Sequence, residues 1–166
     1  MNTGGFWVCT HDKKNPKYDS EPTEVGEKTP DKNISILKSY EKGQVVTKPW
    51  GREILLSKNE EYTFKRIEIK AGFETSLQYH NKKSETIVFL SGHARVVFED
   101  IAGNLVYQDM FPGAVFDVKP PAVHRVVAIT DISYVEASTP DPNGVDVIRL
   151  RDGHKRKDGR IENEYR

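Results

Sequence analysis

The chain has 166 residues, of which 36% are hydrophobic and 30% are charged, values that suit one domain with a single core. Its 25 basic and 25 acidic residues cancel, which removes any bulk electrostatic case for a nucleic acid or an anionic membrane surface as partner. A small, discrete substrate or a protein partner is favoured instead.

The cysteine content and the apolar runs indicate the compartment. Cys9 is the only cysteine, so no internal disulfide can form, and the first residues lack the basic-then-apolar layout of a signal peptide. The longest apolar runs, such as TIVFL and ARVVF, are far shorter than the roughly 20 residues that span a bilayer. We therefore expect a soluble, cytoplasmic protein.

The N-terminal region differs in composition from the rest. Residues 10–33 contain almost no aliphatic side chains and several prolines, so they cannot bury enough surface to offset the entropy of ordering. Phe6 and Trp7 would be exposed to water unless they pack on the folded domain or on a second subunit, and we expect a homodimer; a terminus without fixed structure is the alternative. The expected division is an irregular arm over 1–43, a folded domain over 44–156 and a charged tail over 157–166.

From residue 44 onward the sequence predicts β-structure. Short runs rich in β-branched and aromatic residues alternate with turn signals such as AGF, SGH, AGN, FPG and KPP. Eight or so strands at this spacing favour an antiparallel sandwich or a jelly-roll barrel. A short helix capped by Asn143 is expected over 143–150. The predicted strands are 53–57, 62–69, 85–90, 94–99, 104–108, 114–118, 124–129 and 133–138.

The stretch SLQYHNKKSE, residues 76–85, contains residue types that bind metals. Gln78 and His80 are two residues apart, so on an extended segment their side chains point to the same face, while Glu85 opens the next strand. His124, at the start of a later strand, can complete the set from the opposite side of a barrel. A lone histidine is more often an ordinary side chain, but the combined spacing of these four residues favours a metal site.

This spacing resembles the two motifs of the cupins. Gln78 takes the place of the first motif's first histidine, and a proline-containing turn precedes the histidine of the second motif. The segments KPWG, KRIEIKAG, SLQYHNKKSE and LSG are also similar to the phosphomannose isomerase domain at the C-terminus of mannose-1-phosphate guanylyltransferases, where glutamine is usual in SLQYH. The resemblance covers roughly residues 45–156 and includes VDVIRLRDGHKR, which is similar to that family's closing box. The motif positions are Gly72, Gln78, His80, Glu85, Gly92, Gly113, Pro120, Pro121 and His124.

The resemblance implies an all-β cupin jelly-roll barrel and a metal-dependent isomerase that acts on a small-molecule sugar phosphate, an activity related to polysaccharide biosynthesis. Zinc is the expected ion, with iron, manganese, cobalt or nickel as alternatives. Two imidazoles, one carboxylate and one amide oxygen leave a divalent ion a good Lewis acid. Such an ion stabilises the charge of the enediolate through which an aldose and a ketose interconvert. The implied ligands are Gln78, His80, Glu85 and His124.

Three further positions concern the substrate. Arg149 falls on the arginine of the closing box, which the resemblance implies lies at the active-site mouth, and its guanidinium suits a phosphate or a developing enolate; a solvated charge in a basic tail is the alternative. Lys119, five residues before His124, is expected to point into the pocket as a phosphate contact or proton carrier. His154 stands where the family has tyrosine, which leaves a related sugar phosphate or a nucleotide-linked sugar open as substrate. An iron-dependent oxidising cupin and a non-catalytic sugar-binding module are the competing functions.

Overall fold

The computed structural model describes residues 32–141 and 144–155. The chain divides into two units, Met1–Ile36 and Leu37–Arg166, and the second unit contains every helix and strand of the described residues. Phe6, Trp7 and Cys9 lie outside the described residues, and the expected division into arm, domain and tail stays a prediction. The elements are the 3₁₀ helix η2 (Tyr40–Lys42) and the strands β1 (Gln44–Lys48), β2 (Gly51–Lys58), β3 (Thr63–Ile69), β4 (Leu77–Tyr79), β5 (Glu85–Ser91), β6 (Ala94–Glu99), β7 (Leu105–Met110), β8 (Val115–Val118), β9 (His124–Ala128), β10 (Ile132–Ser138) and β11 (Ile148–Arg151).

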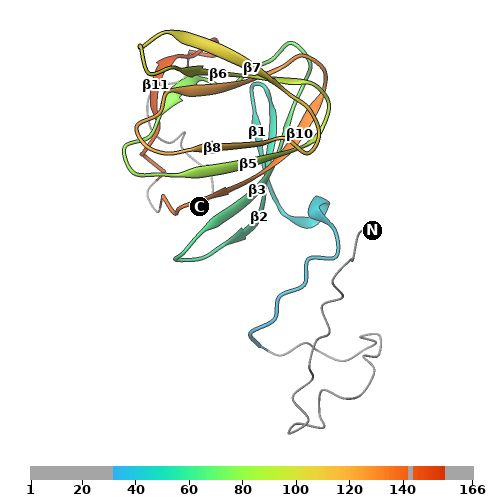
Figure 1. Ribbon diagram of the computed structural model, residues 1–166. Coiled ribbons are helices and arrows are strands. Elements are labelled where there is room, and N and C mark those ends of the chain that lie inside the picture. Colours follow the sequence, from blue (N-terminus) through green and yellow to red (C-terminus); the bar gives the residue numbers. More distant parts are fainter. Residues whose placement is uncertain (1–31, 142–143, 156–166) are drawn as a thin grey trace, which may run out of the picture. The chain divides into compact units, whose positions relative to one another are not determined.

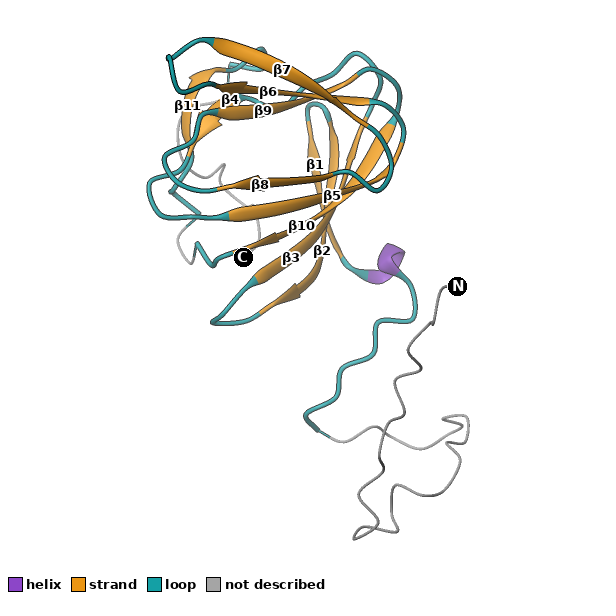
Figure 2. Ribbon diagram, viewed as in Figure 1, coloured by secondary structure: helices purple, strands orange, loops and turns teal. Residues whose placement is uncertain are grey.

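The strands form two antiparallel sheets that face each other as two layers (Figures 1 and 2). One sheet has six strands in the order β1-β2-β3-β10-β5-β8, and the other has five in the order β11-β4-β9-β6-β7. Strands distant in sequence are neighbours in both sheets, since β10 lies between β3 and β5 and β9 lies between β4 and β6. This crossing of connections between two sheets is the jelly-roll arrangement that the sequence predicted.

The hydrophobic core lies between the two sheets. Alternate residues of β5 and β9 are buried, as expected for strands with one face toward a core. The six-stranded sheet contributes large side chains such as Phe89 and Ile67, and the five-stranded sheet contributes smaller ones such as Ala94 and Val126. Large side chains facing small ones fill the space between the layers.

Two glycines of the predicted motifs occupy turns that exclude other residues. Gly72 and Gly92 have φ angles of 81° and 80°, a region that residues with a side chain rarely adopt. At Gly92 a Cβ atom would also lie 2.2 Å from the carbonyl oxygen of Asp131. The backbone between β5 and β6 therefore requires glycine at this position.

The strand predictions are confirmed to within a few residues, but the helix expected over 143–150 is wrong. Asn143 lies outside the described residues, and residues 148–151 form β11 instead of a helical turn. Ile148 and Arg149 pair with Tyr79 and Gln78 of β4, which supplies the backbone hydrogen bonds that a helix would have made internally. The β-branched side chains around Ile148 favour this extended conformation. Strands β1, β4 and β11 were not predicted.

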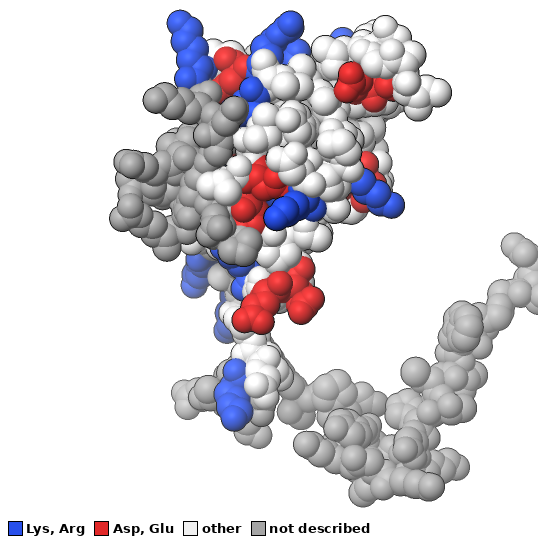
Figure 3. All heavy atoms as spheres, turned by 90° about the vertical axis from the view of Figure 1, so that its left-hand side faces the viewer, with Lys and Arg blue, Asp and Glu red and all other residues white. Residues whose placement is uncertain are grey.

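The described surface agrees with the balanced composition. On the face shown in Figure 3, acidic and basic residues of the described part are interspersed, with no extended patch of one sign. Within 32–141 and 144–155, no helix has the length and apolar character needed to cross a membrane.

Candidate metal centre

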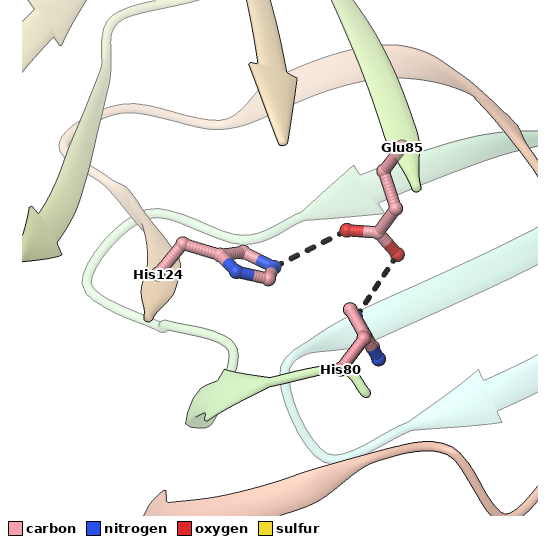
Figure 4. A group of neighbouring side chains, drawn as sticks. All are labelled: His80, Glu85 and His124. Atoms are coloured by element: carbon pink, nitrogen blue, oxygen red, sulfur yellow. Dashed lines mark ion pairs between the residues drawn. The ribbon is translucent and has the colours of Figure 1, made fainter. Parts of the chain in front are cut away.

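Three of the four predicted ligands point toward one another (Figure 4). His80 directly follows β4, Glu85 opens β5 and His124 opens β9. Glu85 Oε1 lies 3.3 Å from His80 Nε2, and Glu85 Oε2 lies 3.2 Å from His124 Nε2. All three side chains are at most 4% exposed, and their potential ligand atoms lie within 4.8 Å of one another.

Backbone carbonyls orient both imidazoles toward the centre of this cluster. His80 Nδ1 is hydrogen-bonded to the carbonyl oxygen of Asp146, and His124 Nδ1 lies 3.0 Å from the carbonyl oxygen of Ala122. A carbonyl oxygen can only accept, so each Nδ1 donates and each neutral ring presents the lone pair of Nε2. His80 Nε2 is buried and has no hydrogen-bond partner, although it lies close to Glu85. Two convergent imidazole lone pairs and a carboxylate are a donor set that fits a divalent ion.

Lys83 balances the negative charge of Glu85. Its ammonium forms an ion pair with Glu85 Oε1 and lies 3.7 Å from Glu136 Oε1. Burial alone would raise the pKa of Glu85, but the Lys83 cation and the two histidines hold that pKa well below its usual range. Burial and the charge of Glu85 raise the pKa of Glu136. Burial lowers the pKa of His124, but the hydrogen bond and the charge of the Glu85 carboxylate, which favour the protonated ring, together with the hydrogen bond to Ala122 raise that pKa overall.

A cavity of about 160 Å³ opens beside the cluster. Gln78, Arg149 and His124 lie in a row across the five-stranded sheet, because Gln78 pairs with Arg149 of β11 on one side and with His124 of β9 on the other. All three line the cavity. Gln78 Oε1 accepts a hydrogen bond from Ser76 Oγ at 2.6 Å. The roles of Gln78 as ligand and Arg149 as substrate contact stay predictions.

Two residues predicted to face the substrate lie elsewhere. Lys119 is exposed and is not among the residues that line the cavity, because it follows the edge strand β8 in the turn before Ala122. The expectation that it points into the pocket is therefore wrong for this structure. His154 stacks on Phe73 with ring centroids 6.3 Å apart and is also absent from the cavity lining.

Sequence reasoning missed several charged residues of the site. Lys83 and Glu136 line the cavity, and Glu136 shares the inward-facing alternation of β10 with Tyr134. A glutamate on the buried face of a predicted strand is a signal that could have been noticed in SYVEAS, since charged residues are rarely buried unless paired. Asp146 gave no local signal, because its contacts with residues 80–83 depend on the fold.

The two facing sheets and the buried His–Glu–His cluster define a cupin, and solved structures agree. The capsular polysaccharide assembling protein CapF from Staphylococcus aureus is similar, with a TM-score of 0.60 and 17% identity over 74% of this chain and 34% of that chain. Oxalate decarboxylase from Lactobacillus farciminis has a TM-score of 0.59 and 18% identity over 70% of this chain and 37% of that one. At these identities the likeness shows the fold alone, and it confirms the predicted cupin barrel.

Within this class, the chain belongs to the mannose-6-phosphate isomerase C-terminal family, which matches residues 37–131. Mannose-1-phosphate guanylyltransferase 2 of Escherichia coli O157:H7 is 28% identical over a match of 138 residues that covers 76% of this chain and 27% of that protein. The family resemblance seen in the sequence is thereby confirmed. The chain spans about a quarter of that curated relative, and Arg149 lies beyond the range matched by the family.

Proposed function

We propose that this protein is a metal-dependent sugar-phosphate isomerase that interconverts an aldose and a ketose through an enediolate. The observation that carries the proposal is the buried cluster of His80, Glu85 and His124, whose imidazoles are oriented by carbonyl groups beside a cavity lined by further charged residues. The family relation to mannose-6-phosphate isomerase domains supports the same chemistry.

His80 Nε2, His124 Nε2 and the Glu85 carboxylate would hold the ion, with Gln78 as a fourth ligand. A divalent ion bound there supplies Lewis-acid stabilisation of negative charge on the substrate oxygens. Zinc suits two imidazoles and a carboxylate, and iron, manganese, cobalt and nickel accept the same ligands.

The cationic side chains of the cavity suit an anionic substrate. Among the described residues, five cations and four carboxylates line it, so a bound divalent ion would leave this part of the wall with an excess of positive charge. Arg149 presents a planar fork that matches a phosphate, and Lys83 adds a buried point charge beside Glu85. We propose that Arg149 orients the phosphate or the developing enediolate. The cations of this lining are Lys48, Lys58, Lys65, Lys83 and Arg149.

Glu136 is the residue that we propose as proton carrier. Its side chain lines the cavity, and its raised pKa, caused by burial and by the charge of Glu85, brings the carboxyl group closer to the range in which it can both accept and release a proton near neutral pH. It takes the role that the sequence had suggested for the exposed Lys119.

A second function is favoured by the composition of the cluster itself. Two histidines and one carboxylate form the facial set typical of non-haem iron oxygenases, so an iron-dependent oxidising cupin uses the same three ligands. Zinc in protein purified from its natural source would exclude the oxidising cupin, because zinc undergoes no redox change.

The test combines elemental analysis of the purified protein with a screen of aldose and ketose phosphates in D₂O. Isomerisation should place solvent deuterium at C2 of an aldose product or at C1 of a ketose product, in a reaction that a chelator stops. A nucleotide-linked sugar included in the screen covers the alternative substrate class. Binding of a sugar phosphate with neither product formation nor deuterium at C1 or C2 would identify a sugar-binding cupin and contradict the isomerase.

The homodimer also remains a proposal. Val115 on β8 and Tyr107 on β7 are exposed apolar side chains on the edge strands of the two sheets, where pairing with a second copy would cover them. Sedimentation equilibrium of the full chain should give twice the monomer mass, and a monomer at high micromolar concentration would contradict the proposal.

A further inference from the structure

We infer that Asp146 is a positioning residue of the metal site, an inference that rests on the proposed function. Asp146 lies two residues before β11, beyond the range matched by the family, and is distant in sequence from every predicted ligand. Its side chain and its backbone both contact the segment that joins β4 to β5, which carries His80 and leads into Glu85.

The carboxylate of Asp146 fixes the backbone of that segment. It accepts hydrogen bonds from the N–H groups of Asn81, Lys82 and Lys83, each at 2.8 Å. Three consecutive amides converge on one side chain, so the turn between β4 and β5 takes its shape from a residue outside it. This turn places Lys83, whose ammonium pairs with Glu85.

The backbone of Asp146 fixes the ring of His80. Its carbonyl oxygen accepts the hydrogen bond from His80 Nδ1, which leaves Nε2 as the nitrogen that faces Glu85. The N–H of Asp146 in turn donates to Asp141 Oδ2 at 2.9 Å. Asp146 is therefore fixed by Asp141 through its own N–H, while its carbonyl and carboxylate fix residues 80–83.

These contacts assign Asp146 the role of an outer partner of the ligands. Loss of its carboxylate frees the 81–83 backbone and lets the carbonyl move away from His80, although neither group would touch the ion. Removing such partners typically lowers metal affinity roughly 10–100-fold. Gly144 and Val147, close to Asp146 in sequence, line the cavity. Asp146 therefore also connects the edge of the cavity to the segment that carries His80.

Asp131 provides a matched control at the opposite end of β9 from His124. Its carboxylate also binds a turn, since it accepts from the N–H of Ala71 at 2.8 Å and from Lys70 Nζ at 2.9 Å. Asp131→Ala thus removes a carboxylate that accepts a hydrogen bond from a backbone amide, but it leaves residues 80–83 unchanged. Any general cost of losing such a hydrogen bond appears in both variants.

The experiment measures zinc dissociation constants by chelator competition for wild type, Asp146→Ala, Asp146→Asn and Asp131→Ala. We expect Asp146→Ala to weaken zinc binding roughly 10–100-fold, Asp146→Asn to weaken it less because an acceptor oxygen remains, and Asp131→Ala to stay within about twofold of wild type. Visible spectra of the cobalt-loaded proteins should change only in the Asp146 variants. Equal affinities in all four proteins would overturn the inference.

A second measurement separates this inference from the proposed function. In the metal-free protein at alkaline pH, ¹⁵N shifts of the His80 ring should report a proton on Nδ1 in wild type and a mixture of tautomers in Asp146→Asn, which keeps the fold if Asp146→Ala does not. If wild type binds no divalent ion, the proposed function fails while this tautomer shift still supports the positioning role. An unchanged His80 tautomer would overturn that role.

Discussion

The six-stranded sheet carries charged side chains on both faces, and the two sets differ in exposure. On the outer face Arg52 and Arg66 both bind Glu68, at 2.6 and 2.9 Å, and the Arg52 and Glu68 side chains are 38% and 24% exposed. On the inner face Glu85 of β5 pairs with Lys83, which lies in the turn just before that strand, and the Lys83 and Glu85 side chains are 13% and 4% exposed. Similar pairs therefore occupy very different surroundings.

This difference in exposure explains why the charged residues of the inner face point to a functional site. An exposed ion pair contributes little to stability, because water and salt screen it. A buried pair requires desolvation of both charges, and well-packed apolar residues would often serve stability as well or better. The inner charges face the cavity beside the His–Glu–His cluster, where the proposed ion and anionic substrate would give them a function.

The largest effect is expected when the inner carboxylate is removed. Glu85→Gln removes the carboxylate that pairs most closely with the buried Lys83 cation and leaves Glu136, 3.7 Å away, beside it, so the unfolding free energy of the metal-free protein should fall by about 3 kcal/mol or more. The matched change on the outer face, Glu68→Gln, should cost about 1 kcal/mol or less. Urea denaturation measures both variants. Equal losses of unfolding free energy in the two variants would mean that the inner and outer faces of the sheet do not differ in this way.

The ligand series sharpens the comparison within the inner face. His80→Ala and His124→Ala should each remove most of the bound metal, whereas Gln78→Ala should remove less, because an amide oxygen is a weaker donor than an imidazole nitrogen. Elemental analysis after dialysis against a limiting chelator measures the retained ion. A larger loss in Gln78→Ala than in the histidine variants would contradict this ligand set.

Arg149 should affect catalysis without affecting metal content. If its guanidinium contacts the phosphate or the enediolate, Arg149→Ala lowers turnover by roughly 100-fold or more, and Arg149→Lys recovers only part of the loss because the fork is missing. Steady-state rates on mannose and fructose 6-phosphates, with metal content and melting temperature in parallel, measure this. Unchanged rates would leave Arg149 a structural residue of β11.

The smallest expected effect concerns the cation beside Glu85. Lys83→Met removes a positive charge next to the site of a divalent ion, so zinc affinity should rise by up to about tenfold while turnover falls. Lys58→Met, a change of the same kind at an exposed lysine of the cavity rim, should change zinc affinity by less. Chelator competition compares the two variants. Weaker zinc binding in Lys83→Met would show that Lys83 supports the site through its contacts rather than opposing the ion by its charge.

Much of the fold could be predicted from the sequence because its signals are local. Strands such as 85–91 and 124–128 show period-two burial and end at turn residues, and the glycine turn at Gly92 is required by its backbone geometry. β11 was missed, because Ile148 and Arg149 become a strand only by pairing with β4, a contact between distant segments.

The candidate site, like the fold, could be predicted where the signal is local and could not where it depends on contacts between distant segments. The spacing predicted that His80, Glu85 and His124 come together, and in the structure they do, with Glu85 and His124 at the starts of strands and His80 directly after one; their role as metal ligands stays a prediction. Lys119 was chosen by its distance in sequence from His124, and the turn that follows β8 leaves it exposed. Asp146 acts through backbone contacts across the fold, and no periodicity in its own segment indicates them.

The most direct test of the central claim is X-ray absorption on the zinc-loaded full chain, with the metal-to-protein ratio determined on the same sample. One ion per chain should be found, coordinated by two imidazole nitrogens and by oxygen at roughly 2.0–2.2 Å, and the imidazole scattering should fall by half in His124→Ala. A ratio near zero, or a bound ion whose spectrum is the same in His124→Ala, would contradict a metal centre formed by His80, Glu85 and His124.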